Sequence, residues 1–118
     1  MSLFDTTQIA LERAMSGATL RHSALAANLA NANTPGYRPM DVDFHSALRD
    51  ALQLGARGVE AVEIAAAPSS DATLRADGNG VDVDVTSARL AENGLELTAI
   101  TRVAGARVDI LRYAMGTR

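Results

Sequence analysis

Cysteine, tryptophan and lysine are missing from this 118-residue sequence, and only four residues are aromatic: Phe4, Tyr37, Phe44 and Tyr113. The lack of cysteine excludes a disulfide framework and thiolate chemistry. Because large rings supply much of the burial energy of an ordinary core, a single small domain with so few of them has limited means of closing a deep core on itself. Hydrophobic residues still make up 47% of the chain, many of them alanine, which favours long helices packed against other helices.

Charge and hydropathy exclude two further classes of protein. All 11 basic residues are arginines, they are dispersed along the chain, and the net charge is −3. No basic run marks a nucleic-acid or anionic-membrane surface, and no apolar stretch approaches the roughly 18 residues of a membrane span. The first ten residues include Asp5 and two threonines, where a secretory signal needs a basic region and an apolar core. We therefore expect no nucleic-acid partner, no membrane span and no cleaved signal peptide.

Residues 5–33 are predicted to form one long amphipathic helix. Residues of one face recur in alternating steps of four and three, which is the spacing of a heptad seam. This seam consists of Phe4, Gln8, Leu11, Met15, Ala18, His22, Leu25, Leu29 and Ala32. A residue within Asp5–Thr7 is suited to cap the helix. Pro35–Gly36 ends it, because proline disfavours the helical backbone conformation of the residue before it.

Residues 84–115 mirror the first segment and are predicted to form a second long helix. Their seam consists of Leu90, Gly94, Leu97, Thr101, Ala104, Val108, Leu111 and Met115. Two features oppose this prediction: Asn93–Gly94 is normally a strong signal for a β-hairpin turn, and Gly105 costs about 1 kcal/mol relative to alanine inside a helix. The residues flanking Asn93–Gly94 nevertheless recur with helical rather than alternating periodicity, so a helix is favoured.

The connector between these helices, residues 34–83, is irregular. Its sequence predicts an extended run at 39–44, a short helix at 45–54, at most a weak strand at 59–64, and a mobile loop within 55–80, where Gly, Ala, Ser and Asp predominate. The predicted fold is therefore a single, mainly α domain with two long helices and a loop-rich middle.

No group of residues indicates a catalytic or metal site. Asp41, Asp43 and His45 alternate and would share one face of a strand as candidate metal ligands, but a solvated face is the better interpretation on an exposed connector. Residues 77–88 begin like a calcium loop, yet the sixth position is not glycine and the twelfth is not glutamate. His22 has no second ligand at metal spacing and is interpreted as a register-setting polar residue or an interface hydrogen-bonding residue. We therefore expect no cofactor and no enzymatic activity.

Three asparagines, Asn28, Asn31 and Asn33, lie near the end of the first helix although asparagine is a poor helix former. A helix terminus explains Asn33. Asn28 lies beside the seam, where its amide suits a helix that packs tightly against several others.

The run Leu25–Tyr37, LAANLANANTPGY, closely resembles the signature of flagellar rod and hook proteins. In that family the signature falls at the end of the N-terminal helix. The runs DVDF at Asp41–Phe44 and DGNGVDVD at Asp77–Asp84, with the LAENGLEL that follows, are similar to the proximal rod members of the family. The resemblance covers both ends of the chain and leaves residues 50–75 unmatched.

The resemblance implies a structural subunit of the bacterial flagellar basal-body rod. Its terminal helices would pair antiparallel as a coiled-coil-like hairpin and stack with those of neighbours into a helical tube. Such subunits leave the cell unfolded through the flagellar type III apparatus, without a cleaved signal, and reside in the periplasmic rod. The implied partners are other rod subunits, further copies of the same chain, the membrane-ring and export-gate base of the flagellum, and the export apparatus in transit.

Three sets of residues are predicted to carry this function. The assembly interface, from the family signature, comprises Leu25, Asn28, Leu29, Asn31, Asn33, Thr34, Pro35, Gly36 and Tyr37. The helix seams comprise Leu11, Met15, Ala18, Leu90, Leu97, Ala104, Val108 and Leu111. The export-gate motif of the family, a phenylalanine followed four residues later by an apolar residue, matches Phe44 and Leu48. Both residues also suit packing inside the folded subunit.

Two alternatives remain open on the sequence. The first is another rod subunit, such as the C-type proximal rod protein or a distal rod protein, although distal rod and hook subunits usually have larger middle domains. The second is a cytoplasmic helical secretion chaperone or adaptor, which would fold as a small stable oligomer.

Overall fold

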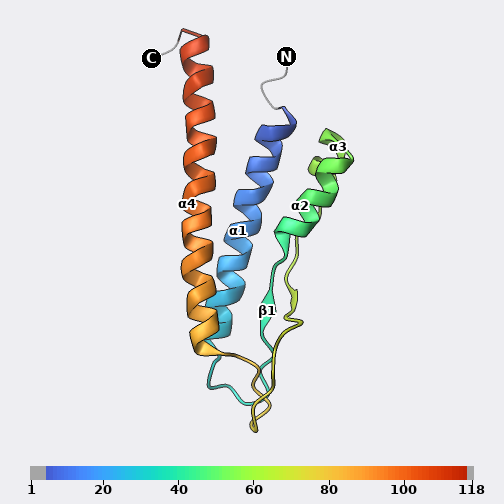
Figure 1. The fold of residues 1–118 in the computed structure, drawn as a ribbon, viewed down its shortest axis with the longest axis vertical. Coiled ribbons are helices and arrows are strands. Elements are labelled where there is room, and N and C mark those ends of the chain that lie inside the picture. Colours follow the sequence, from blue (N-terminus) through green and yellow to red (C-terminus); the bar gives the residue numbers. More distant parts are fainter. Residues whose placement is uncertain (1–4, 117–118) are drawn as a thin grey trace.

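A computed structural model describes residues 5–116 and shows an elongated plate (Figure 1). Its Cα atoms extend over 61 × 31 × 14 Å, with a radius of gyration of 17.5 Å, against about 13 Å for a compact domain of this length. A thickness of 14 Å corresponds to one layer of helices. Helix α1 lies in the middle of the layer, with α4 along one side and α2 and α3 along the other.

Helix α1 spans Thr6–Ala30 and begins as predicted. Asp5 is its N-cap, and the carboxylate accepts a hydrogen bond from the Gln8 backbone N–H at 2.9 Å. The helix ends three residues before Asn33, the predicted last residue. The C-cap is Asn31, and its side-chain amide donates to the Ala27 carbonyl at 2.8 Å. The last carbonyls of the helix therefore find partners outside the helical ladder. Phe4, the first residue of the predicted seam, lies outside the described residues.

Helix α4 spans Val83–Ala114 and runs antiparallel to α1 (Figure 1). Asp82 caps it by accepting from the Val85 N–H at 3.0 Å. Asn93–Gly94 lies within this helix and forms no hairpin turn, because the flanking residues continue the helical hydrogen-bond ladder. The prediction of two long, paired terminal helices with a mainly α fold is confirmed.

The hydrophobic core lies on the other side of α1, between it and helix α2 (Phe44–Gln53). Its buried residues are Ala18, Val42, Phe44, Leu48, Ala51 and Val59. Gly17 makes this packing possible, because a Cβ atom at that position would lie 2.6 Å from the Cβ and Cγ atoms of Phe44. Helix α4 adds little to this core: its buried residues are Thr86, Asn93 and Ala104, of which two are polar and one is small.

The connector contains more regular structure than the sequence predicts. Strand β1 (Met40–Asp41) lies in the run expected to be extended and pairs antiparallel with β2 (Ala67–Pro68). Helix α3 (Ala56–Ala61) replaces the first part of the weak strand expected at 59–64, and residues 62–64 lie in no helix or strand. A short helix satisfies its backbone groups locally, whereas a strand needs a neighbour at its edge. That the segment 55–80 is mobile stays a prediction.

The predicted seams are only partly buried. On α1 the residues Gln8, Ala18 and Leu25 are buried, and Leu11, Met15 and Leu29 are half-buried, whereas His22 is exposed. On α4 Ala104 is buried, Leu90, Leu97 and Leu111 are half-buried, and Val108 is exposed. Within residues 5–116, no helix combines the length and the apolar character needed to cross a membrane.

Candidate functional site

The two sequence motifs, around Pro35–Gly36 and around residues 77–82, meet at one end of the plate. The Gly36 N–H donates to the Asp77 carbonyl at 2.9 Å, and the Gly80 N–H donates to the Tyr37 carbonyl at 3.0 Å. Gly36 and Gly78 both have positive φ angles, which glycine adopts without strain. A Cβ on Gly78 would lie 3.3 Å from the Gly36 Cα. We call this contact between residues 31–37 and 75–81 the clasp.

Asn79 is the central side chain of the clasp and is fully buried. Its Nδ2 donates to the carbonyls of Asn31 and Thr34, each at 2.8 Å, and its Oδ1 accepts from the Val81 N–H at 2.7 Å. Arg75 adds hydrogen bonds to the carbonyls of Ala32 and Val81. The clasp thus supplies partners for the carbonyls that follow α1 and fixes the chain that leads into α4.

Asn28 fastens α1 to the connector. It is 3% exposed; its Nδ2 donates to the Met40 carbonyl at 2.7 Å, and its Oδ1 accepts from the Met40 N–H at 2.9 Å and from the Tyr37 hydroxyl at 3.0 Å. Both polar atoms of its amide are therefore hydrogen-bonded within the subunit. The groups that bind Asn28 belong to the connector of the same chain, and the packing of this part of α1 against several other helices stays a prediction.

The residues of the predicted assembly interface separate into three groups by exposure. Leu25 and Asn28 are buried, Leu29, Asn31 and Tyr37 are half-buried, and Asn33, Thr34, Pro35 and Gly36 are exposed. Only the exposed loop at 33–36 and parts of the half-buried residues are accessible to a neighbour. Their role in assembly stays a prediction.

The predicted export-gate residues Phe44 and Leu48 are both in the core, 1% and 8% exposed. Phe44 packs on Gly17, and both residues belong to the cluster that joins α1 to α2. A receptor can therefore reach these two side chains only in an unfolded or locally opened chain.

Asp41, Asp43 and His45 do not converge on a metal. Asp41 pairs with Arg21 at 2.9 Å, His45 pairs with Glu96 of α4, and Asp43 caps α2 by accepting from the Ser46 N–H at 3.2 Å. The hydrogen bonds from Ser46 lower the pKa of the Asp43 carboxyl. In the described part of the chain no group of three or more His, Cys, Asp or Glu residues is arranged to hold a metal ion.

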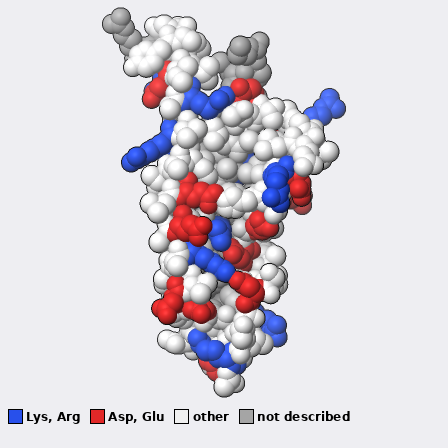
Figure 2. Space-filling view, viewed as in Figure 1, with Lys and Arg blue, Asp and Glu red and all other residues white. Residues whose placement is uncertain are grey.

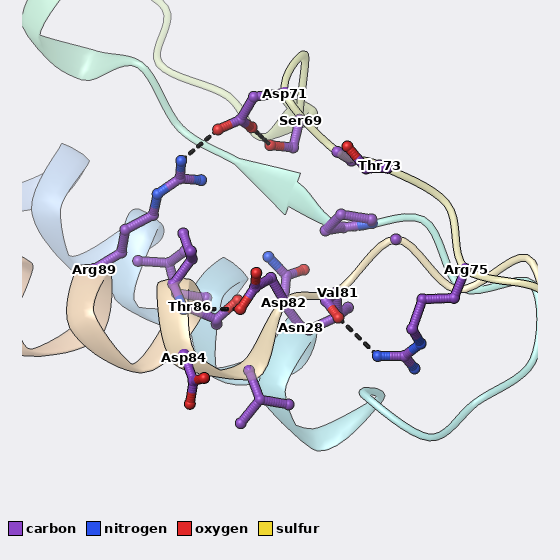
Figure 3. Close-up of a pocket in the computed structure, with 16 residues that line it drawn as sticks. Asn28, Ser69, Asp71, Thr73, Arg75, Val81, Asp82, Asp84, Thr86 and Arg89 are labelled. Atoms are coloured by element: carbon purple, nitrogen blue, oxygen red, sulfur yellow. Dashed lines mark hydrogen bonds and ion pairs between the residues drawn. The ribbon is translucent and has the colours of Figure 1, made fainter.

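An open groove of about 410 Å³ lies between the loop 69–75 and the start of α4 (Figure 3). Most of its charged side chains contact other groups of the protein. Arg89 pairs with Asp71 across the groove, and Arg75 donates to the Val81 carbonyl at 2.9 Å. On the face shown in Figure 2, acidic and basic side chains are interleaved. The groove therefore fastens the connector to α4 through ionic contacts and presents no extended surface of one charge.

The contact between Asp71 and Arg89 makes the attachment of this loop dependent on pH. Hydrogen bonds from Arg89 and Ser69 lower the pKa of the Asp71 carboxyl from 3.8 to about 2. A carboxyl whose pKa is lowered by folding stabilises the folded state above its ordinary pKa and ceases to do so as the pH falls through the folded value. We expect the loop 69–75 to loosen between about pH 4 and pH 2. NMR titration of the Asp71 carboxyl carbon should show the low pKa, and Arg89→Gln should return it towards 3.8; an ordinary pKa in the unaltered chain would contradict the contact.

Helix α4 has a second apolar stripe that is not part of the predicted seam. Six exposed residues recur in steps of four, four, three, four and three on the face turned away from α1: Leu95, Ala99, Val103, Ala106, Ile110 and Tyr113. We call them the outward seam. Leu95, Ile110 and Tyr113 are 74%, 66% and 77% exposed. Large apolar residues at heptad-like spacing on an uncovered helix face are typical of a surface that packs on another helix.

The chain is similar in sequence to a known protein family, and the matched region includes part of the clasp. The sequence model of the family described as "Flagella basal body rod protein" matches residues 9–38, which are most of α1 and the first half of the clasp. The chain is 29% identical to the flagellar basal body rod protein FlgB of Bacillus subtilis over 98% of this chain and 97% of that protein. It is 31% identical to FlgB of Salmonella typhimurium over 75% of this chain and 77% of that protein. It is 33% identical to FlgB of Escherichia coli over 64% of this chain and 68% of that protein. The chain belongs to the flagellar basal body rod protein family.

Proposed function

We propose that this chain is a structural subunit of the flagellar basal body rod. The main support for this proposal is the sequence similarity to FlgB proteins across both terminal helices. In the structure, the two motifs that mark this resemblance form a single clasp that joins those helices. In the groove, Arg89 pairs with Asp71 and Arg75 donates to the Val81 carbonyl, so the chemistry of the site supports a scaffold and gives no support to catalysis.

The outward seam is the surface through which we expect the subunit to pack on its neighbours. It follows α4 from Leu95 to Tyr113, and nothing within residues 5–116 covers it. Its occupants are helices of other rod subunits, including further copies of this chain. Alanines alternate with larger apolar residues along it, which allows a neighbouring helix to come close at Ala99 and Ala106. The exposed loop at 33–36 is a second contact at the opposite end of the plate.

A pair of matched substitutions tests this assignment. Ala91 and Ala99 are both exposed alanines of α4, but only Ala99 belongs to the outward seam. In a strain that lacks the gene, the unaltered chain and the Ala91→Arg variant should restore motility and complete basal bodies. The Ala99→Arg variant should fold with the same helix content yet fail to form the rod, because a buried unpaired charge at a helix–helix contact is strongly unfavourable. A motile deletion strain would refute the function, and a motile Ala99→Arg strain would refute the surface.

Export through the flagellar type III apparatus without a cleaved signal is the route that we propose to the periplasmic rod. The membrane-ring and export-gate base would then be the first partner. Phe44 and Leu48 at four-residue spacing support this route, and their burial requires the exported chain to be unfolded there. Phe44→Ala with Leu48→Ala should abolish secretion of the chain. Val42→Ala is the control, because Val42 is equally buried in the same core but lies outside the motif: it weakens the fold and should leave secretion intact. Loss of secretion in both variants would count against a specific motif.

A further inference from the structure

Asn93 is a buried amide at the centre of the contact between α1 and α4. It is fully buried, and its Nδ2 donates to the Ala18 carbonyl at 2.8 Å. Its Oδ1 is also buried and, within residues 5–116, has no hydrogen-bond partner. The carbonyl that Asn93 binds belongs to the interior of α1 and already accepts from the residue four positions on. The Asn93 side chain therefore donates to a carbonyl that already accepts one hydrogen bond, while its own Oδ1 has no donor within residues 5–116.

This hydrogen-bonding pattern makes Asn93 unfavourable for the stability of the folded chain. A buried carbonyl without a partner carries a desolvation penalty, and asparagine is a poor helix former. An apolar residue would be the more stable choice at a position flanked on the same face by Leu90 and Leu97. A polar residue in an otherwise apolar helix contact is best known for selecting one alignment at the expense of stability.

Helix α4 has two apolar faces, and either of them could pack on α1. The inward seam, which faces α1, consists of Thr86, Leu90, Asn93, Leu97, Ile100, Ala104 and Leu111, all buried or half-buried. The outward seam consists of Leu95, Ala99, Val103, Ala106, Ile110 and Tyr113, all exposed. Each face carries four large apolar side chains. Because burial free energy follows apolar area and is non-directional, it does not by itself decide which face packs on α1.

The other contacts of α4 leave this choice open. The clasp ends at Val81, and Asp82 separates it from the first residue of α4. The clasp does not fix rotation about the backbone bonds of Asp82, so it sets where α4 begins but not how the helix is rotated about its own axis. Ionic pairs also hold α4 to the rest of the subunit, among them Arg107 with Asp5, Arg89 with Asp71, and Glu96 with His45. All of these groups are partly exposed, and exposed ion pairs contribute little. Among the contacts that α4 makes with other elements of residues 5–116, the hydrogen bond of Asn93 is the fully buried directional one.

We propose that Asn93 is a positioning residue that selects the inward face of α4, so that the outward seam remains available for assembly. The hydrogen bond to Ala18 forms in one rotational setting of the helix only. If α4 turned by half a revolution, the amide would face solvent and the outward seam would be buried against α1. The consequence for assembly rests on the function proposed above, whereas the selection itself is a property of the single chain.

The test uses two spin labels and the distance between them. The chain has no cysteine, so cysteines placed at the exposed positions Glu12 of α1 and Thr98 of α4 carry the only labels. Half a turn of α4 displaces the label at position 98 by about 10 Å, the diameter of a helix. The unaltered chain should give one narrow distance. Asn93→Ala removes the hydrogen bond without adding apolar volume, and it should give a second population or a broadened distribution displaced by up to about 10 Å.

A rescue variant and a matched control make the outcome decisive. Adding Val103→Gln and Ile110→Gln to Asn93→Ala makes the outward seam polar, and this variant should return the single distance. Thr86→Val removes a polar group from the same face one heptad earlier and should keep the single distance. The proposal is overturned if Asn93→Ala keeps the unaltered distance, if Thr86→Val broadens it equally, or if Asn93→Ala is disordered and the rescue variant does not restore it. Because the measurement needs no rod, its failure is separable from failure of the proposed function.

Discussion

Gly17→Ala is expected to destabilise the subunit by about 1–3 kcal/mol, the range for added atoms in a well-packed core. The new methyl group would lie 2.6 Å from the Cβ and Cγ atoms of Phe44. These are atoms at the base of a fully buried ring, so relief requires the start of α2 to move. Because Ala51, Leu48 and Val59 pack around the same ring, that movement loosens the contact of α2 with α1. The free energy of unfolding from urea denaturation measures the effect.

A second helical glycine serves as the control for this substitution. A Cβ on Gly105 of α4 would meet no atom within 4 Å, so Gly105→Ala should stabilise the chain by up to about 1 kcal/mol through helix propensity alone. The two substitutions are chemically identical and should act in opposite directions. If Gly17→Ala also stabilised the chain, the close contact between α1 and α2 would be refuted.

Asn79→Ala is expected to cost about 1–3 kcal/mol, because it leaves the buried Val81 N–H without its acceptor. The carbonyls of Asn31 and Thr34 and the N–H of Val81 all lose a bond of 2.7–2.8 Å. The Asn31 carbonyl keeps a bond from the Thr34 N–H, and the Thr34 carbonyl keeps one from the Tyr37 N–H, so the largest loss is at the Val81 N–H. We also expect faster amide exchange at the end of α1 and the start of α4, because both depend on the clasp. Thermal melting and hydrogen exchange measure the two effects.

Asn33→Ala is the control for Asn79→Ala. Asn33 lies in the same motif but is exposed, and an exposed side chain away from special contacts changes stability by no more than about 0.5 kcal/mol. If the two variants lost equal stability, the clasp would not be what holds this end of the plate. If neither lost stability, the buried hydrogen bonds of Asn79 would be contradicted.

The helices were predictable from sequence because helical periodicity is a local property. The seams located both long helices, and Asp5 was correctly among the predicted caps. The end of α1 was placed three residues too late. The bonds that compete with the helix there come from Arg75 and Asn79, which lie far along the chain and are invisible to a local pattern.

The misplaced elements of the connector have the same physical origin. Val59 belongs to a helix because its side chain fills the core beside α2, and the apolar run around it suits a strand equally well. Asn93 looked like part of a turn signal, whereas its amide is used to bind the opposite helix. Asn28 was recognised as unusual, but only the fold shows that Met40 and Tyr37 are its partners. In each case the deciding contact is tertiary.

The plate is one helix thick, and this has a mechanical consequence. The bending stiffness of a plate rises steeply with its thickness, so a single layer of helices is a compliant strip along its 61 Å length. In the proposed rod, stiffness beyond that of a single strip would come from contacts between neighbouring subunits, such as those along the outward seam. Loosening one such contact would soften the assembly while leaving every strip correctly folded.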